Sequence, residues 1–97
     1  MKRFRFYFDN EINSTHIEKH NVSEEEIEEF FSDIIIWTRN RQDDSLESIG
    51  KLNSGRYLTV IYRMMSKYDY FIITAFDIEE YYLQEFIEKE LNKLWKQ

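Results

Sequence analysis

Residues 16–31, His-Ile-Glu-Lys-His-Asn-Val-Ser-Glu-Glu-Glu-Ile-Glu-Glu-Phe-Phe, carry the clearest local structure signal in the chain. Ser23 is followed three residues later by Glu26, the pattern of a capping box, in which hydroxyl and carboxylate each bind a backbone N–H at the start of a helix. Val22 before Ser23 and Ile27 at the fourth helical position form the pattern of a hydrophobic staple. The sequence therefore predicts a helix that starts at Ser23.

One narrow apolar stripe runs along this helix. Ile27, Phe30 and Phe31 stand at positions i, i+3 and i+4, so they share one face. Residues 24–26 are all glutamate and fill the first turn, where the positive end of the helix dipole favours carboxylates. We expect a buried face of three side chains and an acidic face in solvent.

The segment before this helix predicts a strand and a second helix. Residues 3–8 alternate phenylalanine at 4, 6 and 8 with Arg3, Arg5 and Tyr7, the period of a half-buried strand. Asp9 or Asn10 is then expected to cap a helix that runs to His20. Asn21 tolerates the left-handed conformation that ends helices, so the helix should end there.

After the capped helix the chain predicts four strands and one more helix. Asn53, Ser54 and Gly55 are turn residues that should join two of these strands as a hairpin. The expected strands are residues 33–38, 46–52, 56–63 and 70–76, and the expected helix begins at Asp77, with an apolar stripe of Leu83, Phe86, Ile87, Leu91 and Leu94.

These elements predict an α+β fold with the order β-α-α-β-β-β-β-α. Short turns between strands favour an antiparallel sheet with the two N-terminal helices packed on one face, followed by the C-terminal helix. Alternation assigns one set of side chains to the core: Phe4, Phe6, Phe8, Leu58, Val60, Phe71 and Ile73. It assigns another set to the opposite face: Arg3, Arg5, Tyr7, Tyr57, Thr59, Arg63, Tyr70 and Thr74.

Composition favours one domain over residues 1–97. Hydrophobic residues make up 42% of the chain, which is enough for a core. The apolar run at residues 34–37 is far shorter than the ~20 residues that span a bilayer, and no signal peptide is indicated, so we expect a cytoplasmic protein without membrane contact. The chain has no cysteine, which excludes a disulfide framework.

Charge is distributed unevenly along the chain, whose net charge is −6. Residues 9–33 hold nine acids and one lysine, and residues 77–97 hold six acids and three lysines. Residues 1–8 and 34–76 are net positive, by three and by two charges respectively. If the sheet comes from the positive segments, only its side of the molecule can attract phosphate.

Several short motifs resemble, in order, those of the BrnT-type toxins. The motifs lie between residues 6 and 78: Asp9; Lys19-His20-Asn21-Val22-Ser23 followed by Glu25-Glu26; Ile49-Gly50-Lys51 and Gly55-Arg56; and Phe71-Ile72-Ile73-Thr74-Ala75. The family pattern is roughly W-D-x9-K-H-G-V-S-x-E-E-A, I-G-R-x-x-x-G-R and R-I-I-S-A-R. The sequence departs from it at Asn21, where the family has glycine, and at Phe71 and Phe76, where it has basic residues.

The resemblance implies a RelE-superfamily fold and RNA endonuclease activity without a metal or other cofactor. It also implies a cognate DNA-binding antitoxin, of ribbon-helix-helix type, that neutralises the toxin and represses the shared operon. The implied assembly is a toxin dimer or a toxin–antitoxin hetero-oligomer. A second hypothesis is a catalytically degenerate protein-interaction module on the same fold, favoured by the net acidity and by the basic positions lost at Phe71 and Phe76.

Cleavage of RNA without a metal needs a proton acceptor, a proton donor and a cation on the phosphate. The predicted catalytic residues are His20, since imidazole is the side chain best suited to proton transfer, and Arg56 and Arg63, whose guanidinium groups suit phosphate. The predicted substrate-binding residues are Lys51, Tyr57 and Arg5. The structural alternative makes His20 a helix-terminal cation and the arginines solvated strand ends.

His16 and His20 stand four residues apart, which raises the question of a metal site. The intervening residues lack the glutamate that directly follows the first histidine in metalloproteases, and no third ligand is evident. The sequence therefore predicts no metal.

Overall fold

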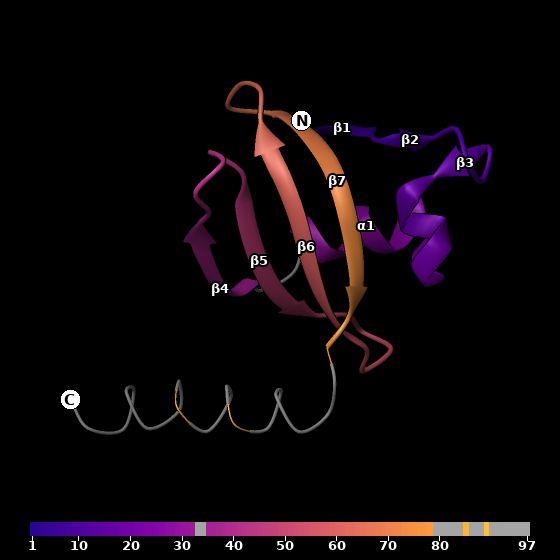
Figure 1. Ribbon diagram of the computed structural model, residues 1–97. Helices are drawn as coiled ribbons and strands as arrows, with labels where there is room; N and C mark the ends of the chain where they lie inside the picture. Colours follow the sequence, from indigo (N-terminus) through magenta and orange to yellow (C-terminus); the bar gives the residue numbers. More distant parts are fainter. Residues whose placement is uncertain (33–34, 79–84, 86–88, 90–97) are drawn as a thin grey trace.

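The computed structural model describes residues 1–32, 35–78, 85 and 89. Five strands form one sheet in the order β1-β7-β6-β5-β4, and two short strands, β2 and β3, form a hairpin beside it (Figure 1). The strands are β1 (Arg3–Phe6), β2 (Phe8–Asp9), β3 (Ser14–Thr15), β4 (Ile35–Asn40), β5 (Leu46–Lys51), β6 (Tyr57–Met64) and β7 (Asp69–Asp77). The helices are the 3-10 helix η1 (His16–His20) and the α-helix α1 (Glu24–Ser32).

The sheet is mixed, so the prediction of an antiparallel sheet is wrong. β4, β5, β6 and β7 pair antiparallel through short turns, but β1 lies parallel to β7, with Arg3 opposite Asp69 and Phe6 opposite Ile72. A tight turn forces antiparallel pairing only on consecutive strands. β1 is joined to the others by η1 and α1, so no turn fixes its direction.

The prediction of two N-terminal helices is also wrong. The segment predicted as the first helix forms the β2–β3 hairpin and the five-residue η1. Between β1 and β4, α1 is therefore the one α-helix of the described chain. Asp9 does not cap a helix; its Oδ1 accepts the N–H of Glu11 at 3.0 Å, and Asn13 is left-handed with φ of 54°. Both features are turn chemistry, which competes with helix formation. The predicted end at Asn21 is confirmed, with φ of 58°.

The predicted capping box is confirmed. The Ser23 N–H donates to Glu26 Oε1 at 3.0 Å, and the Glu26 N–H donates to Ser23 Oγ at 3.1 Å. The buried stripe of Ile27, Phe30 and Phe31 is confirmed as well. Local sequence chemistry therefore places the start of α1 and the face that it buries.

Ser23→Ala should lower the free energy of unfolding by about 1 kcal/mol, because the Glu26 N–H loses its acceptor. Glu28→Ala is the control, since Glu28 is exposed on the same helix, and it should change stability by less than about 0.5 kcal/mol. Urea unfolding of the two variants measures the difference. Equal effects would contradict the role given to the cap.

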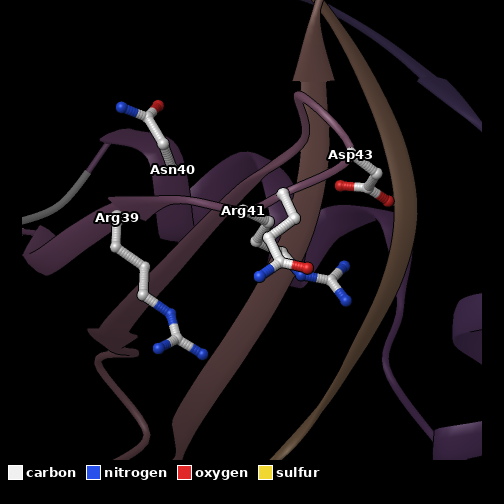
Figure 2. Close-up of a pocket in the computed structure, with 5 residues that line it drawn as sticks. Arg39, Asn40, Arg41 and Asp43 are labelled. Carbon is white, nitrogen blue, oxygen red and sulfur yellow. The ribbon is translucent and has the colours of Figure 1, made fainter.

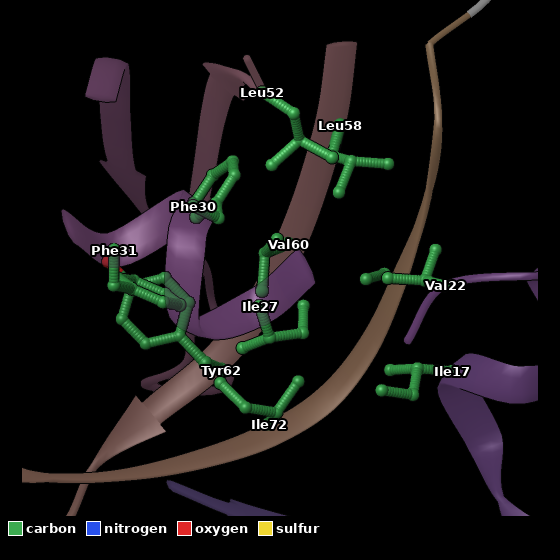
Figure 3. Close-up of a cluster of buried hydrophobic side chains, with 11 residues drawn as sticks. Ile17, Val22, Ile27, Phe30, Phe31, Leu52, Leu58, Val60, Tyr62 and Ile72 are labelled. Atoms are coloured by element: carbon green, nitrogen blue, oxygen red, sulfur yellow. The ribbon is translucent and has the colours of Figure 1, made fainter. Parts of the chain in front are cut away.

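The core lies between α1 with η1 and one face of the sheet (Figure 3). The buried cluster consists of Ile17, Val22, Ile27, Phe30, Phe31, Leu52, Leu58, Val60, Tyr62, Ile72 and Ala75, and Phe4, Phe6, Ile35, Leu46 and Tyr70 pack against it. The prediction for β6 is therefore confirmed at Leu58 and Val60, and that for β1 at Phe4 and Phe6. Phe8 does not join the core and is 49% exposed.

A β-bulge reverses the predicted faces of β7 at residues 70–72, whereas Thr74 lies opposite the core as predicted. Ile61 pairs with Thr74, and Tyr62 pairs with Ile72, so Ile73 is an extra residue in β7. An extra residue shifts the alternation by one position. Tyr70 and Ile72 therefore face the core, in place of the predicted Phe71 and Ile73.

The helix is predicted to start at Asp77, and this start is wrong, because Asp77 is the last residue of β7. Beyond Ile78 the predicted helix lies outside the described residues, apart from Glu85 and Lys89. Their side chains form an ion pair of 3.5 Å, four residues apart. Within the described part of the chain, no helix has the length and apolar character needed to cross a membrane.

Candidate functional site

The sheet face opposite α1, here called the outer face, has an aromatic residue between two arginines. Phe71 of β7 stands directly opposite Arg5 of β1 on one side and Arg63 of β6 on the other. Phe71 is half-buried, and both arginines are exposed. The bulge in β7 produces this row, because it turns Phe71 away from the core.

The outer face is positively charged although the chain is acidic. It carries Arg3, Arg5, Arg39, Lys51 and Arg63 against the two acids Glu47 and Asp69, a net charge of +3 at these positions. Arg3 is paired with Asp69 at 2.7 Å, and Arg39 with Glu47 at 3.0 Å.

The three remaining cations of this face form no ion pair with any described residue. Arg63 donates to the backbone oxygen of Asp43 at 3.2 Å, and the Lys51 ammonium lies 5.5 Å from the centroid of the Tyr57 ring. The Arg5 side chain forms no hydrogen bond or ion pair with a described residue, although its charge contributes, after Ser66 and Arg3, to the lowered pKa of Asp69. These three groups can therefore meet an anion without first breaking a salt bridge.

A second row crosses the outer face toward its edge. Trp37, Ile49, Thr59 and Phe76 stand at opposite positions on β4, β5, β6 and β7. Ile49 and Thr59 are buried, whereas Trp37 and Phe76 at the two ends are half-buried. The row ends at His20, because the imidazole of His20 lies 6.0 Å from the Phe76 ring.

His20 belongs to a polar cluster where the β2–β3 hairpin meets η1. The His16 and His20 rings lie 5.5 Å apart in an edge-to-face arrangement, and His16 Nδ1 lies 3.2 Å from Asp9 Oδ2. Tyr7 lies on the other side of His16, with ring centroids 6.0 Å apart. The pKa of Asp9 is lowered, first by the N–H of Glu11 and then by His16. Asp9 is therefore ionised and can fix the orientation of His16.

Arg56 occupies a structural network next to this cluster. Its Nε and Nη2 bind the Asp77 carboxylate at 2.5 and 3.0 Å, and its Nη1 binds the Glu26 carboxylate at 2.9 and 3.0 Å. Nη1 also donates to Asn21 O at 2.8 Å, and Nη2 to His20 O at 3.2 Å. These bonds engage every nitrogen of the guanidinium group, which has five N–H donors in all. The geometry gives Arg56 a structural role and leaves no donor for phosphate.

The ionisation of this network agrees with its geometry. The hydrogen bonds from Arg56 lower the pKa of Asp77. Burial raises the pKa of Glu26, but the Ser23 N–H and Arg56 outweigh it, so the net shift is downward. The pKa of Arg56 is raised, chiefly by Asp77. The network therefore ties η1, α1 and the adjacent ends of β6 and β7 together as charged groups.

The residues predicted as catalytic lie in two places. His20 and Arg56 are brought together, but Arg63 lies seven residues further along the chain at the other end of β6, about 23 Å away at the usual rise of a strand. Of the predicted substrate-binding residues, Lys51 and Tyr57 lie at the Arg56 end and Arg5 lies beside the Arg63 end. The structure thus has a cationic row beside Phe71 and a histidine cluster beside Phe76, at two different positions along β7.

Two open pockets lie outside both of these places. One, of about 470 Å³, is formed by the turn between β4 and β5 and is lined by Arg39, Asn40, Arg41, Gln42 and Asp43 (Figure 2). Its Asp43 carboxylate binds Ser45, and that contact lowers the pKa of Asp43. The other, of about 580 Å³, lies between η1 and α1, and its lining includes Glu18, Glu24 and Glu25.

The described residues contain no group of three potential metal ligands. Sequence reasoning missed two features of the site: the contact between Asp9 and His16, and the row around Phe71. Asp9 fitted a helix cap equally well, and Phe71 fitted the core under simple alternation. Only the hairpin and the bulge distinguish these alternatives.

Comparison of the chain with protein-family models, with curated proteins and with solved structures finds no match.

Proposed function

We propose that the outer face binds single-stranded RNA and that the chain is a BrnT-like toxin, an endoribonuclease neutralised by a cognate antitoxin. The observation that carries the proposal is the row of Arg5, Phe71 and Arg63. Aromatic rings on a sheet can stack on unpaired bases, and flanking guanidinium groups can bind the phosphates. The sequence resemblance supports the toxin assignment independently of this row.

The charge distribution supports binding of RNA to the outer face and not to the side of the molecule that carries α1. The outer-face positions sum to +3, whereas α1 carries five glutamates and no basic residue. A polyanion is therefore repelled by the α1 side and attracted to the outer face. RNA binding through these few positive charges depends on contacts to phosphate, and such contacts weaken as salt rises, so binding should be weak at high salt.

The test is binding of a fluorescent single-stranded RNA at several salt concentrations. Arg5→Ala and Arg63→Ala should each weaken binding and reduce the slope of log K against log salt by about 0.7, the loss of one phosphate contact. Phe71→Ala should weaken binding by about 1–3 kcal/mol through lost stacking. Arg3→Ala is the matched control, because Arg3 lies on β1 two residues from Arg5 but is paired with Asp69.

Absence of RNA binding at low salt would overturn the proposal. So would binding that Arg5→Ala, Arg63→Ala and Phe71→Ala leave unchanged. Thermal unfolding of each variant establishes that a loss of binding does not come from a loss of the fold.

A non-catalytic protein-interaction module is the second candidate function. The observation that favours it is the row from Trp37 to Phe76, whose two aromatic ends are half-buried, since aromatic side chains of this kind also anchor protein partners. Inducing the chain alone in bacteria and measuring growth and translation distinguishes a toxin from an interaction module. A toxin stops growth and translation, and co-expression of a short ribbon-helix-helix-like protein encoded beside it restores them, whereas an interaction module does neither.

A further inference from the structure

We infer that His16 and His20 are the proton-transferring residues of an RNA-cleaving site, with Asp9 as the positioning residue of His16. The inference rests on the proposed function, because it needs RNA on the outer face. The inference goes beyond the proposed function, because it assigns the proton transfers of RNA cleavage to residues outside the row of Arg5, Phe71 and Arg63.

The geometry of the two histidines suits acid–base catalysis. His16 Nδ1 lies 3.2 Å from Asp9 Oδ2, so a neutral His16 held by Asp9 carries its proton on Nδ1 and leaves Nε2 as the acceptor. The His20 ring lies 5.5 Å from His16. Both side chains are half-buried, which limits their motion and still leaves them accessible to a ligand.

The chain fixes this arrangement on both sides. Asp9 lies in β2, and β2 pairs with β3 immediately before η1, so the hairpin sets the distance from Asp9 to His16. Arg56 holds the other end of η1 through the backbone oxygens of His20 and Asn21. The network of Arg56 thus contributes to the site by positioning η1 rather than by binding phosphate.

The site adjoins the proposed RNA path. β1 leaves the edge of β7 after Phe6, which pairs with Ile72, and η1 contacts β7. His20 lies against Phe76, which is on the outer face and five residues along β7 from Phe71, about 16 Å at the usual rise. An RNA strand that stacks on Phe71 and follows β7 therefore reaches the two histidines.

The step is an internal transesterification. One imidazole takes the proton of a ribose 2′-hydroxyl, and the 2′-oxygen attacks the adjacent phosphorus. The bond from phosphorus to the 5′-oxygen of the next nucleotide breaks, and the second imidazole gives that oxygen a proton. The products are a 2′,3′-cyclic phosphate and a free 5′-hydroxyl, so no oxidant, reductant or further reactant is consumed. His16 held by Asp9 is the acceptor in this scheme, and His20 is the donor; as an imidazolium, His20 is also the cation on the phosphate.

The experiment measures cleavage of an end-labelled RNA and identifies the product ends. Wild-type protein should produce 2′,3′-cyclic phosphate ends, and the same oligonucleotide with 2′-O-methyl groups should bind but stay intact. His16→Ala and His20→Ala should each lower kcat by about 10²–10⁴-fold, and added imidazole should restore part of the rate. Glu28→Gln, exposed on α1, is the control and should retain the wild-type rate.

Asp9 needs a readout that separates positioning from folding. Asp9→Asn should lower kcat while the affinity for the 2′-O-methyl RNA and the melting temperature stay unchanged, and Asp9→Glu should retain more activity than Asp9→Asn. If cleavage survives both histidine substitutions, the inference is overturned while the proposed function stands. If the wild-type protein does not bind RNA, or binds it without cleaving it, the proposed endoribonuclease function is overturned as well.

Discussion

Arg56→Ala is expected to lower the free energy of unfolding by about 2–3 kcal/mol, because two carboxylates and two backbone oxygens lose their hydrogen bonds to Arg56. The Arg56 side chain is 23% exposed, so solvent offsets part of the lost interaction. Urea unfolding at neutral pH measures the change. Arg63→Ala is the matched control, since Arg63 is exposed and makes one hydrogen bond, to Asp43 O. It should change stability by less than about 0.5 kcal/mol.

The effect of Arg56→Ala should depend on pH. Arg56 lowers the pKa of Glu26 and Asp77 below their ordinary values of 4.5 and 3.8. A carboxylate with a lowered folded-state pKa stabilises the fold above its unfolded pKa, and this stabilisation is lost as pH falls through the folded value. The gap between wild type and Arg56→Ala should therefore narrow from neutral pH to below about pH 3. A gap that is constant over this range would contradict the ion-pair network.

Gly50→Val is expected to lower the free energy of unfolding by about 2–3 kcal/mol through overpacking. A Cβ atom at Gly50 would lie 2.8 Å from the ring of Phe30, which is 1% exposed and fixed within the core. Gly50 is therefore needed because Phe30 occupies the space above β5. Glycine has a low intrinsic preference for strands, but at position 50 of β5 it leaves room for the Phe30 ring to pack onto the strand.

A double-mutant cycle with Phe30→Leu tests this contact. Phe30→Leu should be destabilising alone, but the cost of Gly50→Val should be smaller in the Phe30→Leu background, since the clashing ring is gone. Gly55→Ala is the control, because Gly55 has φ of 94° and nothing near its missing Cβ. Its cost comes from backbone strain and should be the same in both backgrounds. Additive costs for Gly50→Val and Phe30→Leu would show that the Phe30 ring does not set the requirement for glycine.

The sequence by itself determined the features that depend on neighbours along the chain. The cap at Ser23, the left-handed end at Asn21 and the buried stripe of α1 each involve residues within one or two helical turns. The strands β5, β6 and β7 also lie where alternation and turn residues predict them. Propensity and capping are local energies, so local sequence is sufficient to predict them.

Only the tertiary structure decided the features that join distant segments. The parallel pairing of β1 with β7 depends on which free sheet edge β1 can reach, and no short-range pattern encodes that choice. The role of Arg56 depends on carboxylates 30 residues before it and 21 residues after it. The bulge at Ile73 turns Phe71 outward and places Tyr70 in ring contact with Phe31 and Tyr62. A shift of one residue reverses the side chains on one side of a bulge, so the packing of the core, and not the periodicity of the sequence alone, determined which residues of β7 reach the outer face.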